Sequence, residues 1–125
     1  PRSTKKDVTS IIAESVVTAS NDIEAKVIVA ATMSGHTAKE ISNLRPSAPI
    51  LATVVNEKVA RELALNYGVY PTIVKEYNST DEVVNDGKKK AQEFANLSKN
   101  DHIVITGGFP NTGNKVTNFM KIEEI

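Results

Sequence analysis

The sequence predicts an α/β fold in which a five-stranded, mostly parallel sheet lies between two layers of helices. Apolar runs of strand length alternate with amphipathic stretches of helix length through most of the 125 residues. This alternation is typical of right-handed crossovers, which build parallel sheets. Two runs, residues 27–31 and 103–105, are apolar at every position, as expected for strands covered on both faces. The length fits one domain, and we treat residues 1–125 as a single domain.

The chain opens with a predicted helix and a predicted strand. Residues 8–20 carry an apolar stripe at helical spacing, and Asp7 is a suitable N-cap. The stripe consists of Val8, Ile12, Val16 and Ala19. The apolar, β-branched run at residues 26–31 then predicts the first strand.

A second helix and a second strand follow. Thr37 and Glu40 form a Thr-x-x-Glu pattern, which predicts a capping box that opens the helix. Pro46 ends it, because the residue before a proline is disfavoured in helical conformation. Residues 49–55 are mostly apolar and predict the second strand.

The third helix is predicted to begin after Asn56 as N-cap and to be closed by Gly68. Residues 69–74 then predict a strand that contains Pro71. Proline cannot donate a hydrogen bond to a neighbouring strand, so this strand is expected at an edge of the sheet.

The final third of the chain predicts one helix and two strands. Ser79 and Glu82 match a second capping box. The face of this helix expected to point inward carries Val84, Ala91, Phe94 and Ala95. Residues 102–106 and 116–122 predict strands with only a loop between them, so the last strand is expected to be antiparallel and at an edge. With Pro71 at the opposite edge, the predicted strand order is 3-2-1-4-5.

Composition excludes several classes of function. The chain has 15 basic and 15 acidic residues, so we do not expect nucleic acid as the main partner. The absence of cysteine excludes disulfides and thiolate metal sites. The longest apolar run, residues 27–33, is far shorter than the roughly 20 residues of a membrane helix. We therefore expect no membrane segment and a cytoplasmic location.

One loop has the parts of an anion-binding site. In sheets of this order, ligands bind at the carboxyl ends of the strands where the order reverses, here between the first and fourth strands. The first strand runs into Thr32, Ser34, Gly35 and Thr37 at the start of a helix. Three hydroxyls, a glycine and a helix N-terminus together favour an anion. The alternative is that Thr37 only caps its helix while the serine and glycine make a turn.

The fourth strand runs into a glycine-rich loop, residues 107–115, which is expected to face the same crevice. Lys115 is a candidate phosphate ligand there, and the alternative is a solvated lysine on a mobile connection. Residues 88–90, three consecutive lysines, are interpreted as a solvated helix face. We find no catalytic set: no positioned acid accompanies Ser34 and His36.

These stretches resemble the C-terminal domain of pyruvate kinase, from about residue 7 to residue 125. The matching segments are residues 31–38, 41–52, 56–63, 67–71 and 105–110, with Thr117 and Asn118. The resemblance implies a regulatory and tetramer-forming domain that binds a phosphorylated effector. In the family the loop of the Thr-x-Ser-Gly-x-Thr type holds an effector phosphate; its counterparts here are Thr32, Ser34, Gly35, His36 and Thr37, with His36 at the variable position.

The resemblance also implies what this domain lacks. The phosphoenolpyruvate, nucleotide, magnesium and potassium sites of the family lie in the barrel domain and its lid, so no cofactor is expected in this domain and this chain alone is expected to be inactive. Its expected partners are the catalytic barrel domain, further copies of the chain and a phosphorylated small molecule. No tryptophan is present and residues 79–87 contain no arginine, so a second phosphate site is not implied. The effector could be a monophosphorylated sugar or a nucleotide monophosphate, or there could be none.

Another interpretation is a free-standing phosphate-ester-binding protein of the same fold. Pro1 in place of an initiating methionine favours the interpretation as a domain of a pyruvate kinase. A flavodoxin-like flavin binder is a third interpretation, which the scarcity of aromatic residues disfavours.

Overall fold

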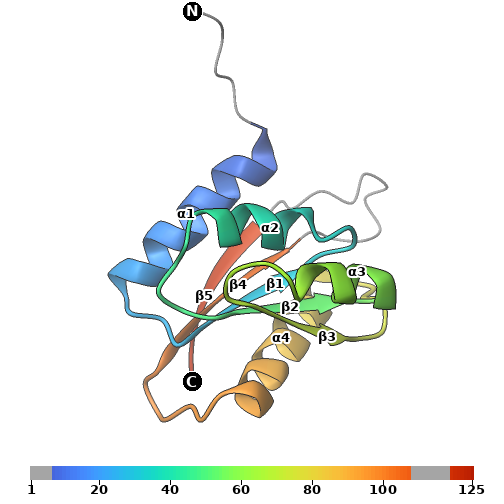
Figure 1. Cartoon of the computed structure of the whole chain (residues 1–125). Helices are drawn as coiled ribbons and strands as arrows, with labels where there is room; N and C mark the ends of the chain where they lie inside the picture. The colour runs from blue at the N-terminus through green and yellow to red at the C-terminus, as the bar shows by residue number, and fades with distance from the viewer. Residues whose placement is uncertain (1–6, 108–118) are drawn as a thin grey trace, which may run out of the picture.

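A computed structural model describes residues 7–107 and 119–125. Its five strands form one sheet in the order β3-β2-β1-β4-β5, which confirms the predicted order (Figure 1). Strand β1 pairs in parallel with β2 and with β4, and β2 pairs in parallel with β3, whereas β5 is antiparallel to β4. The strands are β1 (Val27–Ala31), β2 (Ile50–Val54), β3 (Val69–Ile73), β4 (His102–Gly107) and β5 (Phe119–Glu124).

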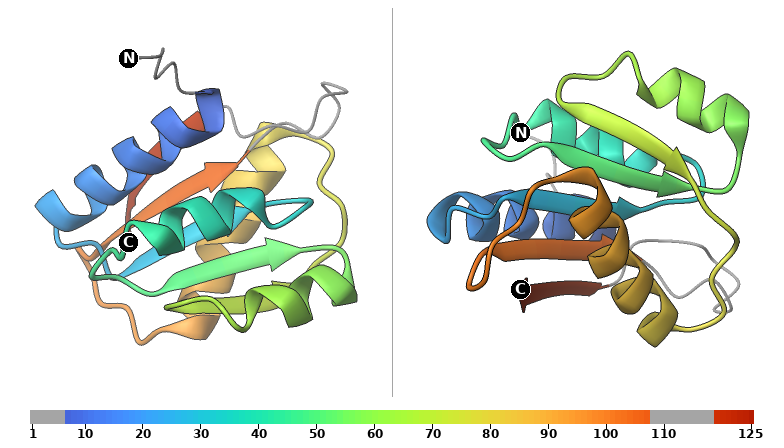
Figure 2. Two further views of the ribbon diagram at one scale, coloured as in Figure 1. Left: turned by 45° about the horizontal axis from the view of Figure 1, so that its top comes forward. Right: turned by 90° about the horizontal axis from the view of Figure 1, so that it is seen from below.

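Among the described residues, three helices cover one face of the sheet and a single helix covers the other (Figure 2). The three are α1 (Val8–Asp22), α2 (His36–Asn43) and α3 (Glu57–Leu63), and the single one is α4 (Thr80–Phe94). Strand side chains alternate between the faces, so Ile28 packs with the three helices and Val29 packs with α4. Both are fully buried, as predicted for a strand covered on both sides.

Three helix N-termini are capped as the sequence predicted. The side chain of Asp7 accepts a hydrogen bond from the Ser10 amide at 2.8 Å, and Asn56 accepts one from the Val59 amide at 3.1 Å. Ser79 Oγ accepts one from the Glu82 amide at 3.1 Å. Each cap of this kind stabilises a helix by about 1 kcal/mol.

The predicted capping box at Thr37 is wrong. The N-cap of α2 is Gly35 in a left-handed conformation, without a side-chain cap, and the helix begins at His36. Thr37 therefore lies inside the first turn, where it is buried. The Glu40 carboxylate accepts a hydrogen bond from Ser10 Oγ at 3.1 Å and so ties α2 to α1.

The helix faces also differ from their predicted positions. In α4 the predicted Ala91 is buried, and Val84 and Ala95 pack against the core while partly exposed. Val83 and Gly87 complete the buried stripe, whereas Phe94 is exposed and lies against Tyr70 with ring centroids 5.4 Å apart. Gly87, which has no side chain to mark it as apolar, lets the helix approach the sheet closely. A Cβ there would lie 3.4 Å from methyl groups of the sheet.

Two smaller differences concern α1 and α3. Val8, predicted to face inward, is half exposed, and Ala13 and Val17 take inward positions instead. Helix α3 ends at Leu63, five residues before the predicted stop; Gly68 instead makes a left-handed turn into β3.

Both edge predictions are confirmed. Gly68 O accepts a hydrogen bond from the Ile50 amide and the Val74 amide donates to Val54 O, so even-numbered residues of this segment bond to β2. Pro71, at an odd position, therefore directs its missing N–H away from the sheet, the arrangement that proline tolerates. At the other edge β5 extends to Glu124, two residues beyond its predicted end, while the predicted Val116 lies outside the described residues.

Candidate functional site

The connection from β1 to α2 and the first turn of α2 hold five of the six candidate ligands: Thr32, Ser34 and Gly35 in the connection, and His36 and Thr37 in the helix. It leaves the sheet where β1 and β4 run side by side, which is the point where the strand order reverses. The strands end in tight contact there, because a Cβ added to Gly107 would lie 3.0 Å from the Ala31 Cβ. The sixth candidate, Lys115, lies outside the described residues.

Gly35 has two separate reasons to be glycine. Its φ of 90° is in the left-handed region that other residues rarely adopt. A Cβ at this position would also lie 3.2 Å from both Leu63 Cδ2 and Val59 Cγ1 of α3. Its carbonyl accepts the Lys39 amide at 3.0 Å, which starts the helix. The glycine therefore sets the direction of the first-turn amides.

Two hydroxyls of the loop fold back onto its own backbone. Thr32 Oγ1 accepts a hydrogen bond from the Gly35 amide at 3.0 Å, and Ser34 Oγ accepts one from the His36 amide at 3.3 Å. A hydroxyl that accepts in this way keeps its proton for donation to a ligand. The first-turn amides of a helix have no acceptor within the helix, and its dipole favours negative charge there.

The three hydroxyls are not equally accessible. Ser34 is exposed, Thr32 is partly buried and Thr37 is only 4% exposed. His36 is exposed and lies near Asp7. The pKa of Asp7 is lowered, first by the hydrogen bonds from Ser10 and to a smaller extent by the charge of His36. Ser34 is therefore the hydroxyl best placed to meet a ligand from solvent.

The structure also contains a hollow that the sequence analysis missed. A cavity of about 710 Å³ lies between the end of β3, the connection that follows it and one face of α4. The signal in the sequence was the spacing of Glu82, Asp86 and Lys90, which puts all three on one face of a helix. The sequence pattern alone favours a solvated helix face for the lysines of this segment.

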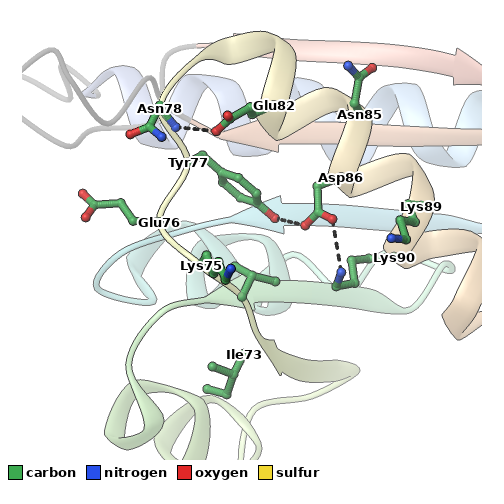
Figure 3. A pocket seen from close by; sticks show the side chains of 11 residues that line it. Ile73, Lys75, Glu76, Tyr77, Asn78, Glu82, Asn85, Asp86, Lys89 and Lys90 are labelled. Carbon is green, nitrogen blue, oxygen red and sulfur yellow. Dashed lines mark hydrogen bonds and ion pairs between the residues drawn. The ribbon is translucent and has the colours of Figure 1, made fainter.

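A three-residue network crosses this hollow (Figure 3). The Tyr77 hydroxyl donates to Asp86 Oδ2 at 2.5 Å, and Lys90 Nζ donates to Asp86 Oδ1 at 3.1 Å. Burial, followed by the hydrogen bond to Asp86, raises the pKa of Tyr77 strongly. Burial acts to raise the pKa of Asp86, but the hydrogen bonds from Tyr77 and Lys90 outweigh it and the pKa is lowered. The network thus holds a neutral phenol and an ionised carboxylate at neutral pH.

Within residues 7–107 and 119–125, no three His, Cys, Asp or Glu side chains gather in a way that could hold a metal ion. No helix in these same segments is long and apolar enough to cross a membrane.

The chain matches known proteins along nearly its whole length. Residues 10–123 match the family model described as pyruvate kinase, alpha/beta domain. The pyruvate kinase of Clostridium acetobutylicum is 38% identical over 121 residues, which are 97% of this chain and 26% of that protein. The pyruvate kinase of Clostridium perfringens is 45% identical over 100 residues, which are 80% of this chain and 21% of that protein.

Solved structures agree with these relatives. A pyruvate kinase from Cryptosporidium parvum superposes with a TM-score of 0.83 at 29% identity, covering 98% of this chain and 24% of that one. A structure of Cryptosporidium parvum pyruvate kinase in complex with ADP gives a TM-score of 0.84 at 28% identity, covering 98% of this chain and 25% of that one. The chain thus spans about a quarter of the length of its relatives. Its sequence and its fold together place it in the pyruvate kinase alpha/beta domain family, as a C-terminal domain of that enzyme.

Proposed function

We propose that this domain binds a phosphorylated small-molecule effector at the β1–α2 loop and serves as a regulatory and assembly domain of a pyruvate kinase. The observation that supports the proposal is the loop geometry: Gly35 in a left-handed conformation starts α2, and the exposed Ser34 hydroxyl lies 3.3 Å from the His36 amide at the start of this helix. Backbone amides and hydroxyls at a helix N-terminus form a favourable site for a phosphate group. Family membership supports a phosphorylated metabolite as the ligand class.

Titration with glucose 6-phosphate tests the effector site. Each hydrogen bond to a charged group contributes about 1.5–3 kcal/mol, so Ser34→Ala with Thr37→Ala should raise the Kd at least about tenfold. Because Thr37 is buried, the single variant Ser34→Ala separates lost binding from lost folding. The matched control is Ser15→Ala with Thr18→Ala, which removes two exposed hydroxyls of α1. Unchanged affinity in both loop variants would mean that the ligand binds elsewhere.

We further propose that copies of the domain associate through β5. This strand is an edge of the sheet, and Ile122 exposes 46% of its surface there. Unpaired backbone groups on an exposed edge favour pairing with another chain, which in a symmetric dimer would be the same strand. Lys121 and Glu123 form an ion pair at 3.2 Å, and these charged side chains only partly disfavour pairing of the edge strand with another chain. Light scattering tests this: Ile122→Lys should shift a dimer to a monomer.

The reaction of the enzyme, phosphoryl transfer from phosphoenolpyruvate to ADP, is assigned to the barrel domain with its magnesium and potassium ions. Phosphoryl transfer needs metal-binding carboxylates and a cationic clamp around the transferring group. We therefore expect no pyruvate from this chain alone in a coupled assay with both ions. Turnover above the buffer blank would contradict this assignment.

A further inference from the structure

The hollow beside α4 exists because, within residues 7–107 and 119–125, one helix covers this face of the sheet. Helix α4 packs over the central strands, where its buried residues contact Val29 and Ile105. The edge strand β3 is left partly uncovered on this side, where Tyr70 remains about half exposed. The connection from β3 to α4 closes one side of the remaining space. Its volume of about 710 Å³ falls within the range of small-molecule sites.

The acidic side chains around the hollow are already occupied or turned away. Both oxygens of Asp86 accept hydrogen bonds, from Tyr77 and from Lys90. Glu82 Oε1 accepts the Asn78 amide at 2.7 Å. Glu76 extends to the far side of the connection, away from the network (Figure 3). These carboxylates therefore offer little to a cationic ligand.

The basic side chains around the hollow are only partly neutralised by carboxylates. Lys75 comes from the connection, whereas Lys89 and Lys90 come from α4, so ammonium groups lie on two walls of the same hollow (Figure 3). Lys90 is paired with Asp86. Among the described residues neither Lys75 nor Lys89 has an ion-pair partner. Lys75 and Lys89 thus line the same hollow, and neither is neutralised by a paired carboxylate.

We propose that this hollow binds a small organic anion carrying two negative charges. Its charged groups pair with Lys75 and Lys89, and its body lies against the Tyr77 ring. Dicarboxylates and phosphate monoesters both carry two negative charges on oxygen atoms, so either class of compound fits this description. The site is independent of the β1–α2 loop, because it opens on the α4 side of the sheet and uses side chains rather than helix-end amides.

The test is an NMR titration of the chain at low ionic strength with malate, glycerol 3-phosphate and inorganic phosphate. We expect malate or glycerol 3-phosphate to shift the Asn85 side-chain amide and the backbone amides around Tyr77, and the stronger of the two identifies the class. Inorganic phosphate has the charge without an organic body, so it should bind here at least about tenfold more weakly. The Ser34→Ala variant should leave these shifts unchanged.

Substitutions sharpen the test in both directions. Lys75→Gln with Lys89→Gln should weaken binding at least about tenfold, since both side chains are exposed and leave the fold intact. The matched control is Lys26→Gln with Lys99→Gln, which removes the same charge near the amino ends of β1 and β4. Asp86→Asn should instead tighten binding severalfold, because it removes a negative charge and releases Lys90.

Three results would overturn the proposal. One is the absence of shifts around Tyr77 and Asn85 with either organic anion. Another is equal binding by the lysine variant and its control. The last is shifts around Tyr77 and Asn85 that disappear in Ser34→Ala, since the response would then come from the phosphate loop.

Discussion

The two candidate ligand sites, the β1–α2 loop and the hollow beside α4, are built from different groups. The β1–α2 loop uses backbone amides and short hydroxyls, and its shape depends on one glycine with φ of 90°. The hollow beside α4 uses long side chains from a helix face and the segment before it, joined by the Tyr77–Asp86–Lys90 network. The first is a site of fixed geometry with no titrating group in its own hydrogen bonds. The second depends on the ionisation of its members.

This difference decides how each region responds to change. A loop that depends on backbone geometry should be most sensitive to a residue that cannot adopt that geometry. A network of a phenol, a carboxylate and an ammonium should respond most to pH. The expected effects below run from the largest to the smallest.

The largest effect is expected from Gly35→Ala. A left-handed conformation costs a non-glycine residue about 1–2 kcal/mol. Contact of the new Cβ with Leu63 and Val59 at 3.2 Å should add about 1–3 kcal/mol. Gly68→Ala is the matched control, because Gly68 has a φ of 69° but nothing within 4 Å of an added Cβ. Urea denaturation should show the larger loss for Gly35→Ala, and equal losses would mean that contact with α3 is unimportant.

An intermediate effect is expected from Tyr77→Phe at alkaline pH. The variant loses a hydrogen bond to a carboxylate and should be less stable by about 1 kcal/mol at pH 7. In the unfolded parent Tyr77 releases its proton near its ordinary pKa of about 10, whereas in the folded protein the raised pKa retains it. The parent should therefore lose stability relative to the variant as the pH rises above about 10. Unfolding free energies measured from pH 8 to 11 test this, and a constant difference would contradict it.

The smallest effect is expected from Asp86→Asn under acidic conditions. The pKa of Asp86 is lowered in the folded protein, so its ionised form contributes stability above the ordinary value of about 3.9. That contribution is lost as the pH falls through the lowered folded pKa. The parent should exceed the variant by less than about 1 kcal/mol at pH 7, because the pair is partly exposed. Thermal unfolding from pH 2 to 7 should show this difference shrinking below pH 4.

Most of the fold could be predicted from the sequence because each element carries a local signal. Unbroken apolar runs marked the buried strands, Pro71 marked an edge, and Asp7, Asn56 and Ser79 marked helix starts. The loop residues from Thr32 to Thr37 were found for the same reason, since they adjoin in the chain at a position that the strand order defines. Their role as ligands remains a prediction.

The sequence by itself determined the strand order, the edges and the position of the β1–α2 loop, because periodicity and turn chemistry act over a few neighbouring residues. Only the tertiary structure decided that Gly35 rather than Thr37 caps α2, because packing against α3 fills the space that a side chain would need. It also decided that Gly87 turns α4 toward the sheet and that Tyr77 reaches Asp86 across a hollow. Each of these contacts joins residues of two different elements. A pattern of neighbouring residues in the sequence does not predict the distance between such elements.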